Sequence, residues 1–512
     1  MKSRLSCFTA VLLTSACLVY AAVQTPFDQP ADFGKYHTQV MSLNVVAMDK
    51  QGQLVTDLKA EDFQVLDDGK PQPIVLFRLN DSRHPPLAAL GPHEYANRPP
   101  GTPRGATLVL FDFLNGSFAD RESMVLTLAK ALSNVESPGN LYLYLLTNKG
   151  TLYPIHALPE RGPDTAAPGE NWTGRTRALL EAAIQKVYGF RPVDYSDTGI
   201  RVVATFNVLR DLGAKLSALP GRKDVVWITN GFPVRVNFDG RCRDIVVWNL
   251  TAPCSGNYVD FTLVLRQLAG QLDTVGVSMY PVDEWTVGEG DRMLVNEMLD
   301  QFTGMTAGRS YPSGGTKTAI PDAIQATHLN YTISYQPASQ NWDGKYHKVK
   351  VDCTRKNIQL QYEQGYIADA LVDETSTLMQ VAAAGNSDVS SIGLRATVTS
   401  GDSPHTVRIQ LRIDPSNLSI VQQNGHYAGQ LTLLYAVRTA EGTPKRLSKP
   451  TSLTLDWTAQ QYDSVSKDGI LVAEDLPAPE GTRQVRIVVA DMRSNQVGSL
   501  TVPVGAALEG KR

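Results

Sequence analysis

The chain lacks any concentration of basic residues. Its 512 residues include 48 Lys and Arg against 51 Asp and Glu, a formal net charge of −3, and no segment is rich in Lys and Arg. Nucleic-acid binding needs a basic patch, so we expect no nucleic-acid partner. The composition, 42% apolar and 19% charged, is typical of a folded protein. A chain of this length divides into several domains.

Long apolar runs are also lacking, except at the N-terminus. Lys2 and Arg4 precede an apolar run at 8–19 and small residues at 21–22. This order is typical of a secretory signal peptide. Residues 1–22 are therefore predicted to be a cleaved signal, and the mature protein is expected to be secreted or periplasmic. No other apolar run reaches about 18 residues, so we expect no membrane span after cleavage.

Cysteine is scarce, and two of the five cysteines lie in the predicted signal. Cys17 could end a lipoprotein signal, but Thr14 stands where Leu is usual, so lipoprotein anchoring is the less favoured alternative. Cys242 and Cys254 lie in one polar insertion and could close a short disulfide loop after export. Cys353 would then be unpaired. Three free thiols are the alternative.

Recognisable catalytic motifs are missing as well. The eight histidines are scattered, without a zinc-protease His-Glu-x-x-His, and no Gly-x-Ser-x-Gly elbow occurs. Residues 313–318 lack the spacing of a phosphate-binding loop and are expected to form a polar turn. The acidic pairs at 67–68 and 283–284 are expected in turns or at helix starts, because glycosidase carboxylates must flank a cleft. We expect no enzyme; a cell-envelope hydrolase with unrecognised catalytic residues is the alternative.

Strand and helix patterns alternate through the middle of the chain. Short apolar runs predict buried strands at 107–111, 141–146, 225–229 and 276–282. Helical spacing predicts helices at 120–134, 175–187, 203–219, 258–273, 292–302 and 319–328. This alternation predicts a parallel sheet covered by helices on both faces.

The flanking segments alternate apolar and polar residues, as β-strands do. The predicted fold class is α/β: a central domain with a doubly wound, mostly parallel sheet, a small N-terminal β-module and a C-terminal β-sandwich. The predicted boundaries are 38–80 for the N-terminal module, 106–336 for the central domain, 337–370 for its β extension and 386–507 for the sandwich. Residues 80–105 and 370–385 are expected to be linkers.

Several separated motifs resemble the acidobacterial VWFA-related family, whose domain is von Willebrand factor type A-like. The matching segments are 45–52, 58–71, 108–115, 219–228, 280–283 and 365–368. They cover about residues 38–370 and leave the C-terminal module out. The resemblance implies a fold better than it implies an activity. We expect an exported, non-catalytic protein-binding, adhesion or envelope scaffolding protein whose partner is another protein.

The resemblance also raises the question of a metal-ion-dependent adhesion site. Type A domains often hold Mg²⁺ or Ca²⁺ where loops leave the carboxyl ends of the strands, using an Asp with hydroxyl residues two and four positions later. Asp112 matches the Asp, but Leu114 and Gly116 occupy the hydroxyl positions. Asn115 and Ser117 offer oxygens one residue later, which requires a bulged loop.

Two further ligands of such a site come from later loops. Asn230 stands where a metal-binding domain would have Asp. Thr205 is favoured over Thr198 as the hydroxyl ligand, because it is expected to open a helix. The candidate is thus a degenerate Mg²⁺ or Ca²⁺ site at Asp112, Asn115, Ser117 and Thr205. The favoured alternative is that no metal binds and Asp112 caps the next segment, because one negative charge holds a divalent ion weakly. We therefore expect no cofactor.

Overall fold

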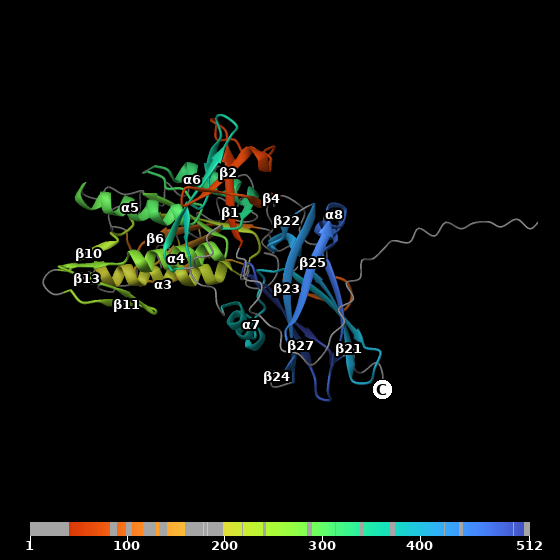
Figure 1. Cartoon of the computed structure of the whole chain (residues 1–512). Helices are drawn as coiled ribbons and strands as arrows, with labels where there is room; N and C mark the ends of the chain where they lie inside the picture. The colour runs from red at the N-terminus through yellow and green to blue at the C-terminus, as the bar shows by residue number, and fades with distance from the viewer. Residues whose placement is uncertain are drawn as a thin grey trace, which may run out of the picture.

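A computed structural model of the chain describes most of the predicted domains (Figure 1). The described residues are 40–81, 90–98, 105–115, 130–132, 141–158, 178, 182, 198–217, 219–238, 242–283, 289–312, 314–337, 343–368, 374–423, 425–439, 444–494 and 496–505. The predicted signal peptide lies outside them, as does most of the helices predicted at 120–134 and 175–187. No helix in the described part is long and apolar enough to cross a membrane.

The central unit contains a five-stranded sheet in the order β15-β9-β6-β7-β8. Its strands are β6 (Gly105–Asp112), β7 (Leu141–Leu146), β8 (Leu152–His156), β9 (Arg222–Thr229) and β15 (Val277–Asp283). All neighbours are parallel except β7 and β8. The predicted α/β class with a mostly parallel sheet is confirmed. Strand β8 was not predicted; it is an edge strand containing Pro154, which a central strand would not tolerate.

Helices cover both faces of this sheet. One face packs against α3 (Thr198–Leu216), α4 (Thr262–Thr274) and α5 (Glu289–Met305), and the other against α6 (Thr316–His328). Along β6, Leu108 and Leu110 point to the first face, while Val109 and Phe111 point to the second. Burial on both faces explains why these strands read as continuous apolar runs rather than as alternating ones.

Two chain segments that flank the central unit pair with each other. The strands are β1 (Met41–Met48), β2 (Phe63–Asp67), β3 (Lys70–Gln72), β4 (Ile74–Asp81), β16 (Leu329–Tyr335), β17 (Tyr346–Cys353), β18 (Gln359–Gln361) and β19 (Gly365–Ile367), with the short helix η1 (Ala60–Asp62) before β2. They form two sheets, β18-β1-β16-β4 and β19-β17-β2-β3. Val45, Val65, Ile333 and Val351 lie in one shared core. The α/β unit is therefore inserted into a discontinuous β-module.

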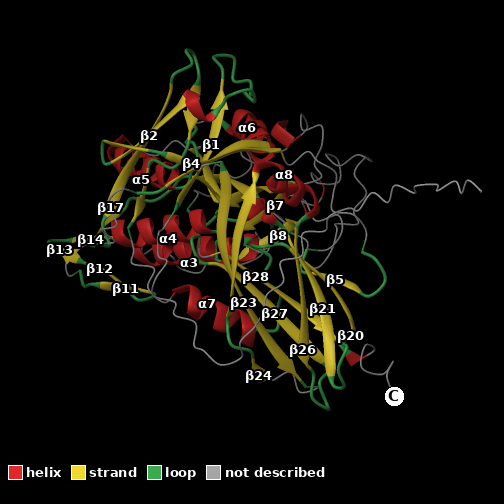
Figure 2. Cartoon of the chain, turned by 45° about the vertical axis from the view of Figure 1, so that its right-hand side comes forward, coloured by secondary structure: helices red, strands yellow, loops and turns green. Residues whose placement is uncertain are grey.

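The C-terminal unit also has two sheets around one core (Figure 2). One sheet contains β26-β21-β20-β5, and the other contains β22, β23, β24, β25, β27 and β28. The strands are β5 (Glu94–Ala96), β20 (Leu394–Ser400), β21 (Thr406–Ile413), β22 (Val421–Gln423), β23 (His426–Arg438), β24 (Pro444–Leu447), β25 (Thr451–Thr458), β26 (Ile470–Pro477), β27 (Gln484–Asp491) and β28 (Gln496–Pro503). Helices η2 (Pro415–Asn417) and α8 (Ala459–Asp468) connect strands of the two sheets.

Both segments predicted as linkers contain regular structure, so those predictions were wrong. Strand β5 pairs with β20, about three hundred residues further on, and Arg98 donates to Asp414 Oδ2 at 2.9 Å. Helix α7 (Glu374–Ala384) packs Met379 and Ala383 against β27 and β28. A three-residue strand carries no readable periodicity, and its partner is too distant in sequence for local patterns to identify.

A set of short strands leaves the carboxyl end of β9 before α4 begins. They are β10 (Arg235–Asn237), β11 (Ile245–Val247), β12 (Leu250–Ala252), β13 (Cys254–Ser255) and β14 (Tyr258–Asp260). The helix predicted from residue 258 starts only at Thr262, because Tyr258–Asp260 pairs with β10 as β14. We call residues 235–260 the strand-end insertion.

Candidate functional site

Asp112 lies where the strand order of the central sheet reverses. The chain continues from β6 to β7 on one side and later returns to β9 on the other side of β6. In open α/β sheets, the crevice at such a reversal, at the carboxyl ends of the strands, is the usual ligand site. Asp112 is the last residue of β6, and Thr229 is the last residue of β9.

The Asp112 carboxylate is fully buried and accepts hydrogen bonds from five donors. Oδ1 accepts from the backbone N–H groups of Leu114 (2.9 Å) and Asn115 (3.0 Å). Oδ2 accepts from Asn115 Nδ2 (2.8 Å), Thr229 Oγ1 (2.7 Å) and Trp227 Nε1 (3.2 Å). The two backbone bonds form an Asx-type turn, so the carboxylate orders the exit loop of β6 and joins it to β9.

The structure brings together three of the four predicted site residues. Asn115 Nδ2 also donates to Thr205 Oγ1 at 2.9 Å, and Thr205 Oγ1 donates to Arg201 O at 2.9 Å. Thr205 does not open its helix as predicted; α3 begins at Thr198, and Thr205 lies two turns in. Ser117 lies outside the described residues.

The donors present do not suit a cation in this arrangement. The Asn115 amide nitrogen lies within hydrogen-bond distance of both Asp112 Oδ2 and Thr205 Oγ1, where a metal ion would need oxygen ligands. Asn115 Oδ1 and Asn230 Oδ1 are buried and accept no hydrogen bond from the described residues. Burial raises the pKa of Asp112, while the donors from Asn115 and Thr229 act in the opposite direction. An amide N–H therefore links the oxygens that a cation would have to bridge.

A position that requires glycine lies between β9 and the strand-end insertion. Gly231 has φ +63, and a Cβ there would lie 2.6 Å from Val295 Cγ1. Its N–H donates to Thr229 Oγ1 at 2.9 Å, the same hydroxyl that donates to Asp112. The segment that leads from β9 into the insertion is therefore hydrogen-bonded to the Asp112 network.

A disulfide and an aromatic contact hold the insertion. Cys242 and Cys254 form a disulfide with their Cα atoms 5.8 Å apart, while Cys353 is free. Trp248 Nε1 donates to Asn207 Oδ1 of α3 at 2.8 Å, and the Arg210 guanidinium lies 4.7 Å from the centroid of the Trp248 ring. The insertion is thus fixed to the body of the α/β unit.

Two strands of the insertion expose apolar side chains. Val246 is 66% exposed and Tyr258 is 47% exposed. Val246 lies in β11, and Tyr258 lies in β14, so both are held by strand pairing. Large exposed apolar groups that are fixed by strand pairing make these strands the candidate binding surface of the α/β unit.

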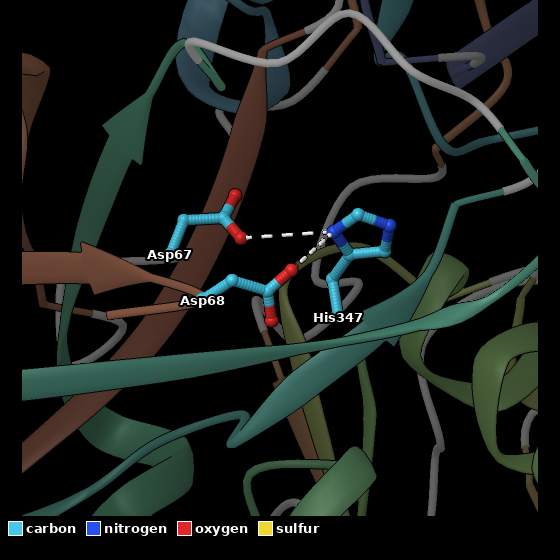
Figure 3. Close-up of side chains that lie close together, drawn as sticks. All are labelled: Asp67, Asp68 and His347. Carbon is cyan, nitrogen blue, oxygen red and sulfur yellow. Dashed lines mark ion pairs between the residues drawn. The ribbon is translucent and has the colours of Figure 1, made fainter. Parts of the chain in front are cut away.

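A second cluster with metal-binding side chains was missed in the sequence. Asp67, Asp68 and His347 lie together in the discontinuous β-module, with potential ligand atoms within 4.8 Å of one another (Figure 3). From the sequence, the two acids are expected in a turn, and His347 is one of eight scattered histidines. Only the pairing of β2 with β17 brings these residues together, and local pattern does not reveal that pairing.

Comparisons with known proteins give distant structural similarity only. No protein-family model and no curated protein sequence matches the chain. The SpaC pilus adhesin of Lactobacillus rhamnosus GG, in its open conformation, shows 9% identity and a TM-score of 0.27, covering 81% of this chain and 70% of SpaC. Human Sec24c, a COPII-coat protein, shows 10% identity and a TM-score of 0.24, covering 55% and 47%.

A mutant of the PilB minor pilin from Streptococcus sanguinis is also similar. It shows 10% identity and a TM-score of 0.26, covering 58% of this chain and 90% of the pilin. At these identities and TM-scores the similarities carry no argument about family or function. The class of the protein rests on its own sheet order: an α/β unit with a mostly parallel sheet, flanked by antiparallel β-modules.

Proposed function

We propose that this chain is an exported, non-catalytic protein-binding or scaffolding protein, and that a von Willebrand factor type A-like domain provides the docking face. The observation that carries this proposal is the strand-end insertion. It is held by a disulfide, fixed to α3 through Trp248, and presents Val246 and Tyr258 to solvent. A rigid surface with exposed apolar groups suits protein recognition, because little conformational entropy is lost on binding.

In this proposal the degenerate adhesion site has a structural role. Asp112, Asn115 and Thr205 are joined by hydrogen bonds that need no cation. Their network shapes the loop beside the insertion and so pre-organises the docking face. Docking would then be independent of Mg²⁺ and Ca²⁺, unlike docking at an intact adhesion site.

Export is supported by two independent features. The N-terminal segment has the order of a signal peptide, and the Cys242–Cys254 disulfide suits an oxidising compartment. The motifs that resemble the VWFA-related family span the units that contain the proposed docking face. Together they support an extracytoplasmic partner protein rather than a cytosolic one.

The test is site-specific photo-crosslinking in the cells that produce the protein. A photo-reactive residue at position 246 should give a discrete adduct with one protein, and Val246→Asp should abolish co-purification of that protein. The matched control is position 471, since Leu471 is an apolar residue, 37% exposed, on β26 of the C-terminal unit. Equal adducts from both positions, or none from 246, would contradict the proposal.

Two further outcomes separate the alternatives. Loss of the adduct in the presence of EDTA, with recovery on adding Mg²⁺, would replace the metal-independent face with a true metal-dependent site. Hydrolytic turnover by the purified mature chain, abolished by a single substitution, would overturn the non-catalytic assignment. Unchanged adduct formation in EDTA and no such turnover are the expected results.

A further inference from the structure

Two strands from distant parts of the chain place Asp67, Asp68 and His347 side by side. Asp67 ends β2 and pairs with Val349 of β17, so His347 on the same strand lies beside the hairpin turn. Asp68 N donates to Lys348 O at 2.8 Å, and Lys348 N donates to Asp68 Oδ1 at 2.9 Å. These paired bonds fix the turn against β17 and leave Asp68 Oδ2 to face the imidazole, 2.9 Å from His347 Nδ1.

Asp67 is held by two tyrosines on its other side. Tyr335 Oη and Tyr366 Oη donate to Asp67 Oδ2 at 3.1 and 3.0 Å. Asp67 is 5% exposed, and its Oδ1 lies 4.0 Å from His347 Nδ1, beyond hydrogen-bond distance.

The imidazole has an outer partner too. His347 Nε2 lies 3.4 Å from Asp343 Oδ1, and the His347 ring stacks on Tyr366 with centroids 5.4 Å apart. In metal sites, a ligating histidine commonly donates its second N–H to a carboxylate, which orients the ring and selects the ligating nitrogen. In this cluster the Asp343 carboxylate contacts Nε2 of His347, and Nδ1 faces Asp67 and Asp68.

We propose that Asp67, Asp68 and His347 bind a divalent transition-metal cation of the Zn²⁺ type, at a site separate from Asp112. Ligands around tetrahedral zinc lie about 3.3 Å apart for bonds of about 2.0 Å. The 2.9 and 4.0 Å separations from His347 Nδ1 lie on either side of that value. Two carboxylates neutralise the ion, and the imidazole favours Zn²⁺ over Mg²⁺ or Ca²⁺.

The site would leave a fourth coordination position open to water or to a partner side chain, as three-ligand zinc sites do. It would also join β2 to β17, the segments that come before and after the α/β unit. Binding to the folded state alone stabilises that state. The cation should therefore stabilise the discontinuous β-module that carries the α/β unit.

The experiment uses the full mature chain, stripped with EDTA and titrated with ZnCl₂ by calorimetry. We expect one Zn²⁺ per chain and a higher melting temperature with Zn²⁺. His347→Ala should lower the affinity by more than about 100-fold, because loss of an outer-shell partner alone costs roughly 10- to 100-fold. Asp68→Asn is the second variant; Asp68 has φ +45, which Asn tolerates, so the turn is kept. The matched control is His426→Ala, which removes an exposed histidine 2.8 Å from the single carboxylate of Asp456.

The outcomes are distinct. Stoichiometric binding lost in His347→Ala and Asp68→Asn, but kept in His426→Ala, supports the site. Absence of binding by the wild-type chain, or binding unaffected by both variants, would overturn the proposal and leave Asp67, Asp68 and His347 as a cluster held by their own contacts. If His347→Ala does not fold, Asp68→Asn and visible absorption of bound Co²⁺ decide the question. None of these results depends on whether the strand-end insertion binds a partner.

Discussion

Substitution of Asp112 by alanine tests whether this carboxylate organises the edge of the sheet. It would leave five donors, two backbone amides and the side chains of Asn115, Trp227 and Thr229, without their acceptor in a buried site. Each buried donor without a partner costs about 1–3 kcal/mol. These costs do not add, because the loop can relax. Breaking a buried hydrogen-bond network is one of the few changes that cost more than about 3 kcal/mol, so we expect a total loss of about 3–5 kcal/mol.

Hydrogen exchange of the sheet strands measures the loss of stability in Asp112→Ala at the sheet itself. A local measurement is needed because a chain of several units need not unfold in one step. A loss of about 3–5 kcal/mol corresponds to exchange roughly 100- to 4,000-fold faster, at about 1.4 kcal/mol per factor of ten. Peptides from β6 and β9 should show it, while peptides from β27 in the C-terminal unit should not. Asp211→Ala, an exposed Asp on the same unit, should change exchange little.

Two results would refute this reasoning. Exchange in Asp112→Ala that equals exchange in Asp211→Ala would show that the carboxylate does not organise the sheet edge. Protection of wild-type β6 that rises with Mg²⁺, and does not rise in Asp112→Ala, would identify Asp112 as a cation ligand. We expect equal protection of the wild-type chain in EDTA and in Mg²⁺.

Two more predictions concern contacts outside the sheet. Burial, and then the charge and hydrogen bond of Glu363, raise the pKa of Asp273 well above its ordinary value, so the folded chain holds a proton that the unfolded chain releases. The stability that this proton contributes is complete below the unfolded-state pKa of Asp273 and is lost as the pH rises through its raised folded-state pKa. Asp273→Asn should therefore make the melting temperature fall less between pH 4 and 8. An unchanged pH profile would contradict the raised pKa. Cys254→Ser should destabilise the strand-end insertion by about 2–3 kcal/mol, seen as faster hydrogen exchange in β11 and β14. A reductant should speed exchange of the same strands in the wild-type chain but not in the variant.

The sequence alone was sufficient to predict the α/β fold class and most strands of the central sheet. Residues 107–111 and 225–229 are apolar without alternation, because parallel central strands are buried on both faces. Asp112 was also identifiable as the residue at a strand end, since it follows such a run directly. These features depend only on neighbouring residues, because the pattern of apolar side chains along a short segment indicates which of its faces are buried.

The contacts that define both candidate sites were decided by the tertiary structure. No local pattern shows that Asn115 directs an amide nitrogen, and not an oxygen, between Asp112 and Thr205. Likewise, His347 meets Asp67 only because β2 pairs with β17 across 280 residues. The pairing of strands depends on the free energy gained when whole apolar sheet faces are buried. That free energy depends on all the packed segments together rather than on any one of them.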